Sequence, residues 1–152
     1  YYILDYYSEV QTKKTHVSLN HALGEMNYLF NIYEETNDDK YLQVALKIKA
    51  ATEDIGDDWI NPTNGDLWYQ INGDRSFEGK DYDTLTLEDL VVSLDYFERF
   101  DLPYDDVFMR LIDTKVNYII DNDVEMKLSL YEQLLLLGFE KQVKDYPHVI
   151  GF

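Results

Sequence analysis

The feature that most constrains this chain is a set of five segments in which apolar residues recur every three or four positions. This spacing places the apolar side chains on one face of an α-helix. The segments cover residues 19–33, 41–55, 87–97, 107–120 and 130–137. The break at Asn37-Asp38-Asp39 is so short that it makes the first two helices antiparallel neighbours. The sequence therefore predicts a domain built of helical hairpins.

The first, third and fifth segments begin alike. Each starts with a hydroxyl residue and a leucine, at Ser18-Leu19, Thr86-Leu87 and Ser129-Leu130. A hydroxyl residue suits the N-cap, because its oxygen accepts a hydrogen bond from a free backbone N–H group. We predict that these three helices are equivalent and that the second and fourth are their return partners. Such alternation is typical of an (α/α) toroid and of a helical solenoid, and the uneven spacing of the three starts favours the toroid.

A long insertion, residues 56–83, separates the second and third helices. Leu67–Ile71 followed by Asn72-Gly73 predicts a β-hairpin in which Asn-Gly supplies the positive φ of the turn, with a return strand around Ser76–Glu78. The tryptophans and tyrosines of the insertion are Trp59, Trp68, Tyr69 and Tyr82. A long loop in a compact domain is usually functional or disordered, and these aromatics argue against disorder. The expected fold is a single all-α domain over residues 1–152, forming part of a toroid with one inserted β-hairpin.

Charge and composition exclude several classes of function. The formal net charge is -17, and such a surface repels nucleic acid and anionic lipid headgroups. Without cysteine, the chain has no disulfide framework, thiolate zinc site or cysteine nucleophile. No stretch approaches the roughly 20 apolar residues of a membrane span. The aromatic start of the chain looks like a segment already packed inside a fold, so we expect a preceding part of the protein.

Polar residues occupy the same early positions in the three equivalent helices. They are Asn20 and His21, Glu88 and Asp89, and Tyr131 and Glu132. If the helices converge, these side chains surround one mouth beside the aromatic hairpin. Aromatic rings stack on sugar faces and carboxylates bind hydroxyl groups, so the set predicts a carbohydrate site. Helix capping and dipole complementation explain the same acids equally well.

Two acidic or histidine clusters suggest metal binding but lack the required spacing. His16, His21 and Glu25 do not contain the paired histidines of a zinc helix. The loop residues Asp57, Asp58, Asn61, Asn64 and Asp66 do not match a calcium loop, and we interpret them as solvated turn residues. No phosphate-binding glycine loop is present. We therefore predict neither a metal site nor a cofactor.

Three stretches of the chain resemble the C-terminal helical domain of the D-glucuronyl C5-epimerases. They are Gly65-Asp66-Leu67-Trp68-Tyr69, then Lys80-Asp81-Tyr82-Asp83 opening the helix that follows, and the hairpin from Ser18-Leu19-Asn20-His21 through Tyr41–Leu46. The resemblance covers about residues 16–100. Gln70, Ile71 and Asp83 stand where the family has arginine or histidine residues.

The resemblance implies acid/base roles for Tyr82 and for Tyr69 or Trp68. In this reaction a proton leaves C5 of a uronate and another returns to the opposite face, so a cation must stabilise the enediolate. Arg75 is the only arginine of the insertion, and it is the expected partner of the substrate carboxylate. A solvated turn residue is the alternative interpretation of Arg75.

Other functions remain open from the sequence. A toroid glycosidase or polysaccharide lyase would pair Glu88 or Asp89 with a second carboxylate. A non-catalytic scaffold would use the helices to bind a partner protein. Because three inner and two outer helices leave apolar faces uncovered, we expect a homodimer or docking onto an upstream domain. The sequence does not fix the compartment, and the sugar interpretation favours a secreted or cell-surface bacterial protein.

Overall fold

The structure is a computed structural model that describes residues 3–6, 9–10, 15–103 and 106–151. Its α-helices are α1 (Leu19–Thr36), α2 (Asp39–Ile55), α3 (Leu85–Arg99), α4 (Asp106–Asp121), α5 (Leu128–Leu136) and α6 (Glu140–Val143), with a 3-10 turn η1 (Gly56–Trp59). Its strands are β1 (Val17–Ser18), β2 (Trp68–Ile71), β3 (Phe77–Lys80), β4 (Met126–Lys127) and β5 (Val149–Ile150). The described chain is thus mainly helical, as predicted.

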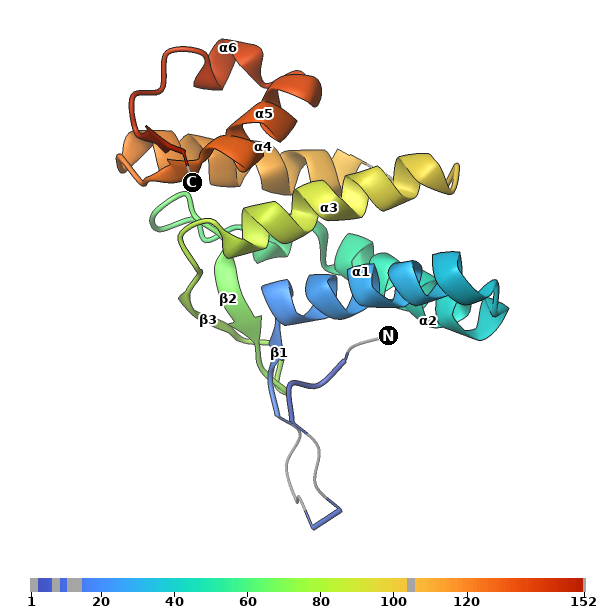
Figure 1. The fold of residues 1–152 in the computed structure, drawn as a ribbon. Coiled ribbons are helices and arrows are strands. Elements are labelled where there is room, and N and C mark those ends of the chain that lie inside the picture. Colours follow the sequence, from blue (N-terminus) through green and yellow to red (C-terminus); the bar gives the residue numbers. More distant parts are fainter. Residues whose placement is uncertain (1–2, 7–8, 11–14, 104–105, 152) are drawn as a thin grey trace.

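The helices are arranged as successive hairpins. α1 packs against α2 and α3, α3 packs against α4 and α5, and α5 packs against α6. In Figure 1, α1 and α3 run side by side from the sheet toward the opposite end of the molecule, and α2 and α4 return. The prediction of antiparallel hairpins is confirmed. Among the described residues, no helix is both long and apolar enough to span a bilayer.

The first hairpin shows how short the connection is. Asn37 ends α1 in the left-handed conformation with φ of 51°, and its N–H donates to the Tyr33 carbonyl. Asn tolerates this conformation better than most residues. Asp38 then caps α2, because its carboxylate accepts a hydrogen bond from the Lys40 N–H at 3.1 Å. Two residues therefore reverse the chain.

One apolar core joins the hairpins and the insertion. Phe97 of α3 meets Phe108 of α4 edge-on at 4.8 Å between ring centroids and Phe30 of α1 at 6.0 Å. Trp59 is also in the core, 1% exposed and edge-on to Phe77 of β3 at 5.5 Å. Each fully buried side chain of this size contributes about 1.5–3 kcal/mol. The insertion is therefore packed into the fold at its base.

The described β-structure exceeds the single hairpin that was predicted. β1 joins β2 and β3 in an antiparallel sheet, with Val17 opposite Ile71, and β4 pairs with β5 in parallel. The predicted hairpin is thus present, but it belongs to a three-stranded sheet, and a second, two-stranded pair was not predicted. Two-residue strands such as β1 and β4 carry no period-two pattern, so the sequence gives no sign of them.

Two of the three predicted N-caps are wrong. α3 begins at Leu85 and α5 at Leu128, so Thr86 and Ser129 lie inside the first turn. Thr86 is buried there, and its hydroxyl donates to the Asp81 carboxylate at 2.6 Å. Ser18 does occupy the N-cap position of α1, but its hydroxyl binds the Asp5 carboxylate instead of the helix.

The insertion also departs from prediction at its turns. The positive φ of the hairpin turn, 69°, belongs to Arg75 rather than to Asn72-Gly73. The Arg75 N–H donates to the Asn72 carbonyl at 2.9 Å and closes the turn. Asn61 and Asp66, interpreted as solvated, are 7% and 0% exposed. Tertiary packing draws this part of the loop into the core.

Candidate functional site

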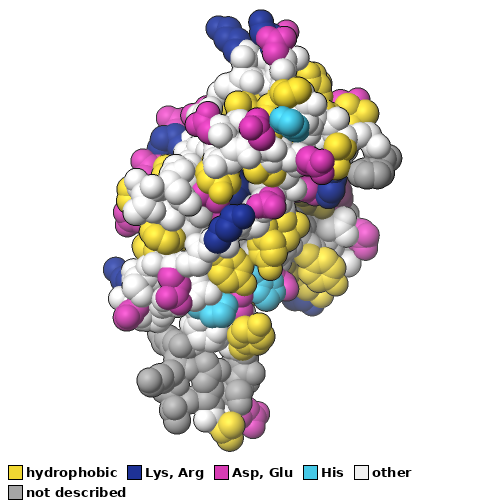
Figure 2. Space-filling model, turned by 90° about the vertical axis from the view of Figure 1, so that its left-hand side faces the viewer, with side chains coloured by type: hydrophobic (Ala, Val, Ile, Leu, Met, Phe, Trp, Pro, Cys, Tyr) yellow, Lys and Arg dark blue, Asp and Glu magenta, His cyan; other side chains and the backbone are white. Residues whose placement is uncertain are grey.

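The N-terminal ends of α1 and α3 and the open end of the hairpin share one face of the molecule (Figure 1). Figure 2 looks onto that side and shows histidine side chains among hydrophobic and aromatic ones, with charged groups of both signs nearby. Four aromatic rings follow one another across it, those of Tyr6, His16, Tyr69 and Tyr82. We call these four residues the aromatic face.

The tyrosine pair is the centre of the aromatic face. The Tyr69 and Tyr82 rings meet edge-on, 5.8 Å apart. Tyr69 stands in β2 opposite Gly79 of β3, where a Cβ atom would lie 3.0 Å from the Tyr69 Cβ. Gly79 also has φ of 86°, a conformation that glycine adopts without strain. A glycine at this position therefore leaves the space that Tyr69 occupies.

The pKa of the Tyr82 phenol is raised above its ordinary value. Tyr69 is the largest cause, through its charge when ionised and through a hydrogen bond, and the charges of Asp81 and Asp5 add to it. The carboxylate of the adjacent Asp81 raises the pKa of Tyr82 less than the neighbouring tyrosine does. Tyr82, with 48% of its surface exposed, therefore carries a neutral phenol at physiological pH.

Two histidines lie next to the tyrosine pair and share one carboxylate. Asp5 lies 3.2 Å from His16 Nε2 and 3.5 Å from His21 Nδ1, and its own side chain is only 7% exposed. The Ser18 N–H also donates to Asp5 at 2.8 Å. His16 in turn contacts the Tyr69 ring at 6.2 Å between centroids. Asp5 thus contacts the imidazole of His16, which belongs to the aromatic face, and the imidazole of His21.

The acids of α3 lie at the same end of the helices. Glu88 accepts hydrogen bonds from Lys127 Nζ at 3.0 Å and from the Thr84 hydroxyl at 3.0 Å. Burial raises the pKa of Asp89 to about 7, and the charges of Glu88 and Asp81 contribute to this shift. A carboxyl group with this pKa can hold or release a proton near neutrality.

α1 and α3 face each other near Asp89. The facing positions of α1 and α3 are linked by hydrogen bonds from Asn27 to the Asp89 carbonyl and from the Ser93 hydroxyl to Asn27. One helical turn before Asn27, Gly24 leaves open space where a side chain would stand. Further toward the N-terminus, the buried Oδ1 of Asn20 has no hydrogen-bond partner among the described residues. This end of α1 therefore has open space at Gly24 and a buried acceptor, Asn20 Oδ1, without a hydrogen-bond partner among the described residues.

The remaining predicted site residues are more dispersed. Arg75 lies in the hairpin turn, and about 10 Å of strand separates Tyr69 from that turn at ~3.3 Å per residue. Trp68 is half-buried, and its strand position is opposite Lys80. Tyr131 is half-buried in α5. Trp59 is buried in the core and is not available to stack on a ligand.

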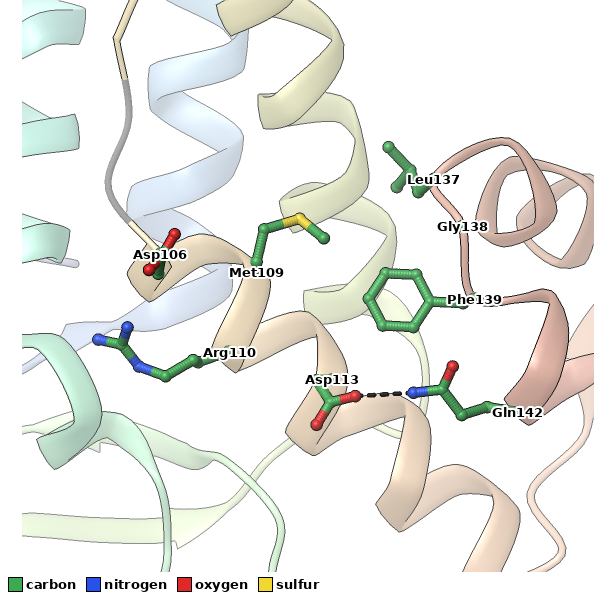
Figure 3. A pocket seen from close by; sticks show the side chains of 8 residues that line it. All are labelled: Asp106, Met109, Arg110, Asp113, Leu137, Gly138, Phe139 and Gln142. Carbon is green, nitrogen blue, oxygen red and sulfur yellow. Dashed lines mark hydrogen bonds between the residues drawn. The ribbon is translucent and has the colours of Figure 1, made fainter.

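Two cavities lie outside the aromatic face. One, of about 410 Å³, is bounded by Arg75 together with Leu4, Val17 and Ile71. The other, of about 460 Å³, lies between α4 and the α5–α6 turn and is lined by Met109 and Phe139 among others, with Asp113 bound to Gln142 at 2.8 Å (Figure 3). Neither contains the tyrosine pair. Within the described residues, no group of three His, Cys, Asp or Glu side chains is arranged to hold a metal ion.

Sequence reasoning missed several members of the site. Asp5 and Lys127 come from short segments without a helical pattern, so no signal connects them with His21 or Glu88. Glu25 was correctly grouped with His21, which lies 3.7 Å from it, and His16 joins these residues through their shared neighbour Asp5. Asn20 and His21 are the second and third residues of α1, as predicted, whereas Glu88 and Asp89 are the fourth and fifth residues of α3, because α3 begins at Leu85.

The sequence was also compared with known proteins. No protein-family model matches it, and no curated protein is significantly similar to it.

Proposed function

We propose that this domain binds a uronate-containing glycan across the aromatic face and acts as a C5-epimerase-like enzyme with Tyr82 as proton donor. The observation that carries the proposal is the contact between Tyr69 and Tyr82 at 5.8 Å beside two histidines held by Asp5. Exposed rings provide stacking surfaces for pyranose C–H groups. The neutral phenol provides a proton, and an imidazole can accept one.

The proposed reaction needs a base and a cation as well as the acid. The imidazole of His21, oriented by Asp5, would take the C5 proton, and Tyr82 would return one to the other face of the carbanion. Arg75 lies at the far end of the hairpin, so it does not suit the role of enediolate stabiliser. Two lysines of the hairpin and the helix ends are held by carboxylates: Lys80, bound to Asp83 at 3.2 Å, and Lys127, bound to Glu88 at 3.0 Å. In this proposal one of them exchanges its partner for the substrate carboxylate.

Deuterium exchange tests the proposal directly. In D₂O, the protein should incorporate deuterium at C5 of a uronate polymer, and Tyr82→Phe should lower the rate by about 10²–10⁴, as expected for a lost general acid. Tyr28→Phe is the matched control, because Tyr28 is a similarly exposed tyrosine on α1, with 60% of its surface accessible. Equal exchange in the wild type and in Tyr82→Phe would remove Tyr82 from the mechanism. No exchange on any uronate polymer would refute the epimerase assignment.

We further propose that the hairpins are part of an (α/α) toroid, with α1, α3 and α5 as inner helices. The order of contacts supports this, since α1 packs against α2 and α3, α3 packs against α4 and α5, and α5 packs against α6. Leu136 of α5 is 88% exposed and Leu128 is 44% exposed, which suits a surface that another helix covers. The covering helix would belong to a second copy or to a preceding domain. Sedimentation of the chain as a monomer that binds no hydrophobic dye would contradict this arrangement.

A glycosidase or polysaccharide lyase is the second candidate, and Asp89 favours it. A half-buried carboxyl group with a pKa of about 7 suits the general acid of glycosidic cleavage. The open space at Gly24 and the unsatisfied Asn20 Oδ1 would accommodate part of the sugar. Cleavage of neutral or acidic oligosaccharides that is lost in Asp89→Asn but retained in Tyr82→Phe would favour this candidate over epimerisation.

A further inference from the structure

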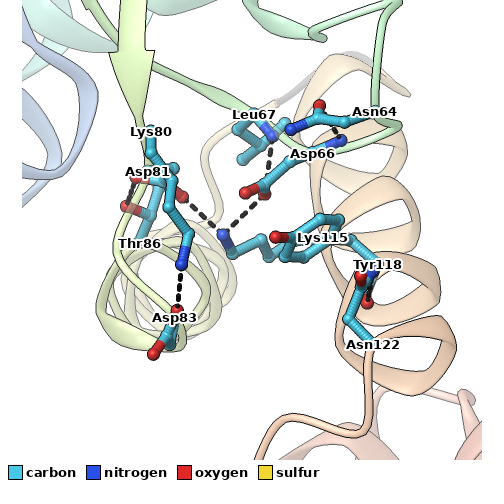
Figure 4. A network of polar contacts seen from close by, with 10 residues as sticks. All are labelled: Asn64, Asp66, Leu67, Lys80, Asp81, Asp83, Thr86, Lys115, Tyr118 and Asn122. Carbon is cyan, nitrogen blue, oxygen red and sulfur yellow. Dashed lines mark hydrogen bonds and ion pairs between the residues drawn. The ribbon is translucent and has the colours of Figure 1, made fainter.

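A lysine is completely buried between two carboxylates beneath the hairpin (Figure 4). Lys115 of α4 is 0% exposed, and its Nζ lies 2.6 Å from Asp66 Oδ1 and 2.8 Å from Asp81 Oδ2. Both carboxylates come from the insertion, and their side chains are 1% and 0% exposed. We call Asp66, Lys115 and Asp81 the buried triad.

The other contacts of the buried triad fix its geometry. Asp66 Oδ1 also accepts a hydrogen bond from the Leu67 N–H at 2.7 Å, and Asp81 Oδ1 accepts one from the Thr86 hydroxyl at 2.6 Å. Lys115 also lies 5.2 Å from the centre of the Tyr118 ring. A charged group in such a site is costly unless it is paired and hydrogen-bonded, so displacement of any member is strongly opposed.

The two carboxylates flank the hairpin, one before β2 and the other after β3. Asp66 is three residues before Tyr69 and leads directly into β2, whereas Asp81 follows β3 and immediately precedes Tyr82. Trp68 and Lys80 are paired at this open end of the hairpin. One ammonium group therefore holds both chain segments that carry the tyrosine pair, at the end where the two rings meet.

We infer that Lys115 is a positioning residue, which sets the Tyr69–Tyr82 geometry by anchoring Asp66 and Asp81 to α4. Lys115 is buried and does not itself touch the aromatic face, so its influence passes through the backbone on either side of the hairpin. The catalytic relevance of this positioning rests on the proposed function. The effect of Lys115 on the geometry of Tyr69 and Tyr82 can be measured without any substrate.

The experiment compares two buried lysines. Lys115→Met keeps the length of the side chain and removes its charge. Lys49→Met is the control, because Lys49 is 7% exposed, lies in α2 away from the hairpin and pairs with one carboxylate, Glu53. The readout is NMR of tyrosine-labelled protein, with the Tyr82 signals assigned through Tyr82→Phe. It reports ring-to-ring contacts between Tyr69 and Tyr82 and the phenol pKa of Tyr82.

We expect Lys115→Met to lose the Tyr69–Tyr82 contact and to lower the pKa of Tyr82 toward its ordinary value. Lys49→Met should be less stable but should retain the Tyr69–Tyr82 ring contact and the raised pKa of Tyr82. Since Lys115→Met leaves two buried carboxylates unpaired and could unfold the chain, Asp81→Asn provides a second variant. It preserves the Lys115–Asp66 pair and an acceptor for Thr86, and the neutral side chain suits a position where burial raises the carboxyl pKa.

Asp81→Asn should remain folded while the Tyr82 ring becomes mobile relative to Tyr69. An unchanged ring contact and an unchanged Tyr82 pKa in a folded Asp81→Asn or Lys115→Met protein would overturn the inference. Loss of both signals in the Lys49→Met control would also overturn it, because the effect would then follow from general destabilisation. The deuterium-exchange assay is separate. Altered ring geometry without any exchange activity in the wild type would refute the proposed function and leave the positioning role intact.

Discussion

Replacing Asp89 by asparagine should stabilise the protein, and the gain should grow with pH. Burial raises the pKa of Asp89 from 3.8 to about 7, so the folded state opposes ionisation of this carboxyl group. The contribution of the Asp89 carboxyl group to the free energy of unfolding is therefore fully present below the unfolded-state pKa, near 4. It is lost as the pH rises through the folded-state pKa of about 7. Asparagine has a similar shape and carries no charge at any pH in this range.

The size of the effect follows from the pKa shift. A difference of roughly three units at about 1.4 kcal/mol per unit corresponds to roughly 4 kcal/mol across the full window. The Asp89 side chain is only half-buried, and solvent screening reduces this to about 2 kcal/mol. In a domain of this length, that difference raises the midpoint of thermal unfolding by roughly 4–8 °C.

Urea unfolding of wild type and Asp89→Asn at pH 4.5, 6, 7 and 8 measures the difference directly. The free energy of unfolding of the variant should exceed that of the wild type by an amount that increases through this series. Asp121→Asn, at an exposed position at the end of α4, is the control for removing a carboxylate from a solvent-accessible site. A constant difference between wild type and Asp89→Asn from pH 4.5 to 8 would refute the argument that burial controls this group.

Two further substitutions test particular contacts. Gly79→Ala should destabilise the protein by about 1–3 kcal/mol and displace Tyr69, because the new Cβ would meet the Tyr69 Cβ at 3.0 Å in a backbone of φ 86°; an unchanged melting temperature and Tyr69 spectrum would contradict this. Tyr146→Phe should cost about 1–3 kcal/mol, because its hydroxyl donates to backbone carbonyls at 2.6 and 3.0 Å, whereas Tyr28→Phe at an exposed site should cost almost nothing. Equal unfolding free energies for these two variants would show that the buried hydroxyl contributes nothing.

The helices could be predicted from the sequence because their apolar spacing is local information. Leu19, Leu23, Met26 and Phe30 are all buried on one face of α1. The starts of α3 and α5 were misplaced by one or two residues, because a threonine or serine near a helix start was taken as its cap. In the structure a buried carboxylate, Asp81, takes the hydroxyl of Thr86 instead.

The candidate site was predictable only where it lies on helices. The early positions of α1 and α3 indicated His21 and Asp89, whereas Asp5 reaches the site from the N-terminal segment through contacts that no local pattern encodes. The burial of Lys115 could be suspected from the sequence, because this lysine lies on the apolar face of α4 between Leu111 and Ile119. A lysine at that spacing indicates either a buried partner or a snorkelling side chain, and the sequence does not identify the partner.

The buried triad also has a consequence for the order in which the chain folds. Asp66 and Asp81 lie 49 and 34 residues before Lys115, so none of the three finds its partners through local structure. Desolvating the ammonium before the carboxylates arrive is unfavourable, and the reverse is also true. We therefore expect the hairpin to dock onto α4 in a single cooperative step. In native-state hydrogen exchange, the amides of β2 and the middle of α4 should open together as one cooperative unit, while those of α2 open independently.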